Sequence, residues 1–104
     1  VEEIDKKIKG KTFFIKSLTV DVEMLKEKAT IPEITNELKP LYDAVRYSDP
    51  MSDDALTSIE RQITSLMSEL GEGVEKADID VVKKDVKNIT VLLSERNKKC
   101  KLLK

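Results

Sequence analysis

Hydrophobic residues recur along most of the chain at intervals of three and four positions, the spacing that places side chains on one face of an α-helix. Four segments follow this spacing, and no segment sustains the strict alternation of a half-buried β-strand. The pattern therefore predicts four amphipathic helices and an all-α fold. From the apolar positions and the residues between them, we expect helices at about 1–29, 31–48, 53–71 and 79–103.

Residues with strong preferences for helix ends separate these segments. Thr30 and Glu33 have the spacing of a capping box, and Pro32 suits the first turn of the second helix. A proline-containing turn at residues 48–52 precedes acidic residues that favour a helix start. Gly71 and Gly73 are expected to end the third helix, and Asp78 or Asp80 to start the fourth. The resulting short connections favour helices that alternate in direction.

The predicted architecture is a single antiparallel up-down four-helix bundle that covers residues 1–104, with the first and last helices longer than the inner two. If these long helices pair from their common end, residues 1–11 and 97–104 project beyond the bundle as a two-helix, coiled-coil stalk. Both chain ends then leave from the same end of the bundle. Because the chain begins at Val1 and both ends lie within helical pattern, we expect a fragment of a longer protein.

The composition excludes several kinds of chemistry. The 104 residues contain no histidine and one cysteine, Cys100, which excludes His-based catalysis, zinc sites with His ligands and an internal disulfide. Residues 5–12 end like a phosphate-binding loop, but they lack its first glycine and follow no strand. No nucleophile, base and orienting group can be assembled, so we expect a protein that is not an enzyme and uses no cofactor, metal or small-molecule substrate.

The formal net charge of -1 conceals an uneven distribution of charge. Residues 6–16 and 96–104 hold ten of the 19 basic residues and no acidic residue, whereas residues 17–95 hold 17 acidic and nine basic residues. A solvated helical face would explain these runs, but cations at one pole also suit an anionic membrane surface or an acidic partner. Nucleic acid is the less favoured partner. We define the basic pole as Lys6, Lys7, Lys9, Lys11, Arg96, Lys98, Lys99, Lys101 and Lys104.

Two cations interrupt the apolar series, Lys11 in the first helix and Arg96 in the fourth. They would fall in one layer of the bundle, where an unpaired charge is costly. The turn at this level carries Asp49, Asp53 and Asp54, so we expect one or more of these carboxylates to pair with a cation of the layer. The alternative is that both long side chains reach water from the edge of the stalk.

Two groups of residues outside the predicted core are candidates for recognition. Phe13, Val20 and Met24 recur at helical spacing on the side of the first helix away from its main apolar stripe. They would form a second apolar surface, suited to a homodimer contact or to a groove for a partner helix. The turn after the second helix is rich in side chains that form hydrogen bonds. Its candidates are Arg46, Tyr47 and Asp49.

The sequence predicts a non-enzymatic helical interaction domain that acts as a scaffold or adaptor, in the cytoplasm or at the inner face of a membrane that anchors the larger protein. Its partner would be another protein, a second copy of the chain or an anionic membrane surface. One alternative is a free-standing helical chaperone or regulator that binds a partner helix through Phe13, Val20 and Met24. Another is weak nucleic-acid binding through the basic pole, with steeply salt-dependent affinity.

Overall fold

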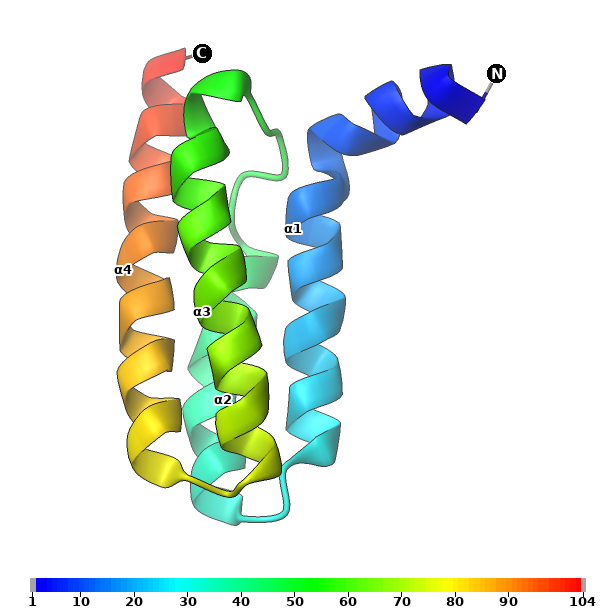
Figure 1. Cartoon of the computed structure of the whole chain (residues 1–104). Helices are drawn as coiled ribbons and strands as arrows, with labels where there is room; N and C mark the ends of the chain where they lie inside the picture. The colour runs from blue at the N-terminus through cyan, green and yellow to red at the C-terminus, as the bar shows by residue number, and fades with distance from the viewer. Residues whose placement is uncertain (1, 104) are drawn as a thin grey trace.

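The computed structural model describes the backbone of residues 2–103 and the side chains of residues 12–103 (Figure 1). Four long helices account for most of it, and a single 3-10 turn, η1, precedes the third. The predicted all-α fold with four helices is confirmed over the described residues. The elements are α1 (Glu2–Lys28), α2 (Pro32–Arg46), η1 (Asp54–Leu56), α3 (Thr57–Glu75) and α4 (Ile79–Leu103).

The helices pack as two hairpins that lie against each other. Figure 1 shows α1 and α3 running in one direction and α2 and α4 in the other. Extensive packing joins α1 to α2, α3 to α4 and α2 to α4, and a sparser contact joins α1 to α3. The order around the core is therefore α1, α2, α4, α3, with α1 and α4 at opposite corners. Residues 47–53, here named the crossing segment, produce this order by passing over one end of the bundle.

The expected pairing of the first and last helices is wrong, and so is the two-helix stalk built on it. Because the crossing segment leads α3 to the far corner, α4 packs against α2 and α3, while α1 packs against α2 and α3 on the opposite side. Figure 1 shows the N-terminal part of α1 bending away from the other helices, whereas the end of α4 runs on beside the start of α3. Both marked chain ends lie at the same end of the molecule, but their helices diverge.

The core consists of the apolar stripes that the three- and four-residue spacing defined. A fully buried Leu, Ile or Val side chain contributes roughly 1.5–3 kcal/mol to stability. Each long helix supplies several such side chains, so the packing of one face of every helix determines the fold. These include Ile15, Leu18, Val22 and Leu25 of α1, Ile34, Leu38, Leu41 and Val45 of α2, Ile63 and Leu70 of α3, and Val82, Ile89 and Leu93 of α4.

The third helix runs beyond both glycines that were expected to end it. Gly71 and Gly73 both lie inside α3, which continues to Glu75. A Cβ atom added to Gly73 would lie 3.0 Å from Cγ1 of Val81. This glycine therefore allows α3 and α4 to approach closely beside their connection, and its role is in packing and not in helix termination.

Ala77 terminates α3 in the left-handed backbone region, with φ 54°. Its N–H donates to the carbonyl of Val74 at 3.1 Å, and the N–H of Asp78 donates to the carbonyl of Gly73 at 2.9 Å, the pair of bonds of a Schellman motif. The Asp78 carboxylate then accepts a hydrogen bond from the N–H of Val81 at 3.3 Å, so Asp78 starts the fourth helix as one of the two expected aspartates.

The second helix begins one residue later than a cap by Thr30 requires. Ile31 is the N-cap and makes no side-chain capping bond, so the expected capping box is not formed. Pro32 follows as the first helical residue and favours the extended backbone that Ile31 adopts. The helix continues through Pro40 to Arg46.

Candidate functional site

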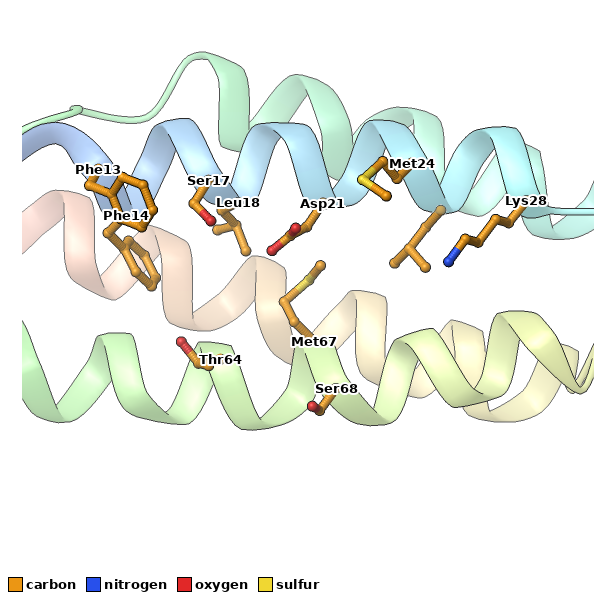
Figure 2. A pocket seen from close by; sticks show the side chains of 11 residues that line it. Phe13, Phe14, Ser17, Leu18, Asp21, Met24, Lys28, Thr64, Met67 and Ser68 are labelled. Atoms are coloured by element: carbon orange, nitrogen blue, oxygen red, sulfur yellow. The ribbon is translucent and has the colours of Figure 1, made fainter. Parts of the chain in front are cut away.

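A groove of about 550 Å³ lies between α1 and α3, where helix packing is sparsest (Figure 2). Figure 2 shows Phe14 and Met67 reaching into the space between the two helices, with Thr64 and Ser68 on the α3 wall. The groove thus combines an apolar floor with polar side chains on both walls. Its lining is Phe13, Phe14, Ser17, Leu18, Asp21, Met24, Leu25 and Lys28 of α1, and Thr64, Met67 and Ser68 of α3.

An exposed row of apolar side chains runs along α1 beside this groove. Phe13 is 61% exposed, Val20 53% and Met24 47%. Phe13 and Met24 line the groove, and a second hollow joins Phe13 to Val20. The structure therefore places the three predicted recognition residues together on one face, here named the apolar strip. Their neighbour Phe14 is half-buried and packs against the core.

Arg96, which the sequence assigned to the basic pole, is fully buried beneath the crossing segment. Its Nε donates to Oε2 of Glu60 at 2.9 Å, in an ion pair with the start of α3. Nη1 donates to the main-chain carbonyl of Asp49 at 2.8 Å, and Nη2 to that of Met51 at 3.0 Å. The guanidinium also lies 5.4 Å from the ring centre of Phe14. Arg96 is therefore a structural anchor and is not available to an external anion.

The structure satisfies Arg96 with a carboxylate that the sequence did not single out. Glu60 supplies the ion pair, whereas Asp49 contributes its main-chain oxygen. The carboxylates of Asp49 and Asp53 accept hydrogen bonds from backbone N–H groups two residues further on, at 3.0 and 2.9 Å. These two acids shape the turn and cap η1. The second cation, Lys11, lies outside the described side chains.

Further hydrogen bonds hold the crossing segment against α3 and α4. Ser52 Oγ donates to the same Glu60 oxygen that Arg96 contacts, at 2.8 Å. Asn97 Nδ2 donates to Ser48 Oγ at 3.2 Å. The buried thiol of Cys100 lies 3.5 Å from the carbonyl of Met51. Consecutive turns of α4 therefore hold this connection in one place.

Another candidate, Tyr47, lies next to part of the basic pole. Its side chain is 79% exposed, and the guanidinium of Arg46 lies 5.8 Å from its ring centre. A hollow of about 360 Å³ between α2 and α4 joins Tyr47 to Lys98 and Lys101. The two regions were predicted separately and are brought together here.

The remaining lysines of the basic pole do not form one described surface. Lys99 is exposed on α4, but the helix segments that carry Lys6, Lys7, Lys9 and Lys11 turn away from it (Figure 1). Those four side chains and Lys104 lie outside the described ones. Across residues 2–103, no helix carries an apolar run of the length that a membrane crossing requires.

Asp85 of α4 is a buried acid that sequence reasoning missed. Its side chain is fully buried, and neither carboxylate oxygen has a hydrogen-bond donor within the described part of the chain. The pKa of Asp85 is raised from 3.8 to about 6, first by burial and then by the neighbouring Glu69 carboxylate, whereas Lys84 opposes the shift. Asp85 lies three residues after Val82 and four before Ile89, and this helical spacing is the sequence signal that places it on the buried face.

Neither a candidate metal site nor similarity to known proteins identifies a function for these surfaces. No group of three or more Cys, Asp or Glu side chains suited to a metal ion occurs among residues with described side chains. No family model matches the chain, and neither a curated protein nor a solved structure shows significant similarity to it.

Proposed function

We propose that the chain is a non-enzymatic helical interaction domain that binds the apolar face of another helix along the groove between α1 and α3. The observation that carries this proposal is the sparse α1–α3 contact, which leaves Phe13 and Met24 exposed beside an apolar floor. Contiguous exposed apolar surface is unfavourable in water and marks interaction sites in soluble domains. A partner that covers this surface gains the hydrophobic contribution that the free chain forgoes.

The shape of the groove favours a helix over a small molecule. Its α1 wall runs from Phe13 to Lys28, which corresponds to roughly 22 Å at about 1.5 Å per residue. A bound helix presents side chains at the same three- and four-residue intervals and has its backbone hydrogen bonds already satisfied. Thr64 and Ser68 can bond to polar side chains at the edge of such a helix. This elongated site therefore suits an adaptor or scaffold that recognises helices.

Nucleic acid and anionic membranes are less favoured partners. Arg96 is buried, and the helix segments that carry the other cations of the basic pole diverge. The hollow that joins Tyr47 to Lys98 and Lys101 is the remaining described surface with this character. It offers two cations and one aromatic ring, which is fewer phosphate contacts than strong nucleic-acid binding uses.

The proposal is tested with synthetic amphipathic peptides, each with leucines at helical spacing and with different flanking charges. In NMR titrations we expect at least one peptide to shift amide signals of α1 and α3 and to leave the outer face of α4 unchanged. Met24→Glu places a charge beside the groove and should weaken binding at least tenfold, since it costs well over 1.4 kcal/mol to desolvate that charge.

Val91→Glu is the matched control, because Val91 is an exposed apolar residue of α4 away from the groove. It should bind the peptide as the unmodified chain does. The proposal fails if none of the peptides binds, or if Met24→Glu binds as tightly as Val91→Glu.

A further inference from the structure

The apolar strip of α1 has the spacing of a coiled-coil seam. Phe13, Ser17, Val20 and Met24 are separated by four, three and four residues, the alternation of a and d positions in a heptad. The core stripe of α1 lies on the opposite side of the helix. Helix α1 therefore has two seams, one that packs in the bundle and one that faces water.

Exposed charges lie along both edges of this second seam. Successive residues of an α-helix are rotated by about 100°, so side chains seven positions apart share an edge. Lys16 and Glu23 share one edge, and Asp21 and Lys28 share the other. All four are exposed, and the ion pair found among the described side chains is a different one, between α3 and α4. The exposed Glu27 lies on the same edge as Lys16 and Glu23. Both edges thus carry charges of both signs that have no ion-pair partner within the described chain.

We propose that a second copy of the chain covers the apolar strip, with the two α1 helices parallel and related by a two-fold axis. In a parallel pair, each residue on one edge faces the residue five positions further on at the opposite edge of the partner helix. Lys16 then faces Asp21 of the second copy, and Glu23 faces Lys28 of the second copy. Symmetry repeats both contacts, which gives four ion pairs around a seam in which Phe13, Val20 and Met24 meet their own counterparts.

The charge pattern selects the parallel orientation. An antiparallel two-fold pair brings identical edges together, so it lets Lys16 attract Glu23 of the second copy but brings Asp21 near Asp21 of the second copy. The parallel pair forms all four attractive contacts without this repulsion. Asp21 and Lys28 also line the groove. The second copy's Lys16 and Glu23 would therefore lie over the groove and help to close it. The inference rests on the proposed function, because it names the occupant of the same face.

The test is sedimentation equilibrium of the whole chain over a wide range of concentration. We expect a reversible dimer that Val20→Asp abolishes and that added salt weakens. Lys16→Asp alone and Asp21→Lys alone should each raise the dimer dissociation constant about tenfold, because each change affects two symmetry-related pairs of exposed charges. The double variant that carries both changes should return to within a few-fold of the original value. All these positions are exposed, and circular dichroism verifies that each variant keeps its helical content.

Rescue by the double variant identifies an intermolecular contact, since Lys16 and Asp21 lie on opposite edges of one helix and do not face each other within a chain. Lys87→Asp, at an exposed position on α4, is the matched control and should leave dimerisation unchanged. A double variant Lys16→Glu with Glu23→Lys discriminates orientation, because it creates repulsion in the parallel pair and preserves attraction in the antiparallel one.

Three results would overturn the inference. The first is a chain that stays monomeric at every concentration, and the second is a Val20→Asp variant that dimerises as the unmodified chain does. The third is rescue of dimerisation by the exchange of Lys16 and Glu23 but not by the exchange of Lys16 and Asp21. A monomeric chain that still binds an amphipathic peptide in the groove removes the second copy as occupant and leaves the proposed function standing. A monomeric chain that binds no peptide removes both.

Discussion

Two buried charged side chains give the two sides of α4 different characters. Arg96 lies under the crossing segment, and each of its three nitrogen atoms donates a hydrogen bond to a described group. Asp85 lies against α3, and the described residues offer no donor to either of its oxygens. Both are fully buried, but Arg96 compensates its lost hydration and Asp85 does not. The difference shows that the partners, and not burial itself, decide whether an internal charge stabilises the bundle.

The partners differ because the backbone around each charge differs. The crossing segment is largely irregular, so its carbonyl groups need donors that no helix ladder supplies. Arg96 meets this need at Asp49 and Met51 and pairs with Glu60. Around Asp85, α3 and α4 satisfy their own backbone groups. Its carboxylate therefore accepts no hydrogen bond from the surrounding backbone, and its burial in the α3–α4 interface lowers the free energy of unfolding.

Of the proposed substitutions, removal of the Arg96 guanidinium should change the free energy of unfolding most. Arg96→Met should lower the free energy of unfolding by roughly 3–5 kcal/mol, because it removes the cation that pairs with the partly buried Glu60 carboxylate and the guanidinium donor to two main-chain carbonyls. Urea denaturation followed by circular dichroism measures this change. Arg61→Met, at an exposed position of α3, is the control and should stay within about 0.5 kcal/mol of the unmodified chain. Equal effects of the two substitutions would show that the contacts of Arg96 do not stabilise the fold.

The uncompensated charge should produce the opposite effect and a dependence on pH. The folded-state pKa of Asp85 is raised from 3.8 to about 6, so its carboxyl is protonated in both states below the lower value and ionised in both above the higher one. The folded chain should therefore lose stability as pH rises from about 4 to 6, by up to roughly 3 kcal/mol at 1.36 kcal/mol per unit.

Asp85→Asn tests this dependence directly. It should raise the free energy of unfolding by about 2–3 kcal/mol at neutral pH and by little near pH 4, because the unmodified side chain is then neutral as well. Urea denaturation at a series of pH values measures the difference. Glu95→Gln, at an exposed acid of the same helix, should leave the pH profile nearly parallel to the original. A gain from Asp85→Asn that is the same at both pH values would contradict the assignment.

The smallest expected change in the free energy of unfolding comes from a strained backbone conformation in the same α3–α4 hairpin. Ala77 has φ 54°, a conformation that costs a residue with a Cβ atom about 1 kcal/mol relative to glycine. Ala77→Gly should therefore stabilise the chain by about 0.5–1 kcal/mol in the same denaturation experiment. At the preceding Lys76, φ is -83°, so Lys76→Gly relieves no strain and should destabilise the chain. A loss of stability in both variants would refute this origin of the gain.

Much of the architecture could be predicted because one period controls it. The spacing of Ile34, Leu38, Leu41 and Val45 fixes which face of the second helix is buried, and the other helices follow the same rule. The same period places Phe13 on the side away from the core. The order of the helices could not be derived, because a connection of the length of the crossing segment can reach either an adjacent or a diagonal corner.

The details of the two buried charges depended on that order. The break in the periodic pattern at Arg96 correctly indicated a cation that needs compensation, but Glu60 was missed because its position follows from the path of the crossing segment. Asp85 has the spacing of a buried residue, yet an acid at the edge of an apolar stripe has the same spacing when it is solvated. Gly71 and Gly73 suggested a helix end, but glycine also permits close helix packing, and here that second role prevails.

The path of the chain also has a kinetic consequence. Each hairpin closes from neighbouring segments, whereas Arg96 bonds to backbone groups 47 and 45 positions earlier in the sequence. Those bonds can form only after both hairpins have docked, so we expect them to be absent from the rate-limiting barrier of folding. Substitutions at Arg96 would then hasten unfolding and leave the folding rate almost unchanged. In that case the arginine governs how long the folded molecule persists and has little influence on how fast it assembles.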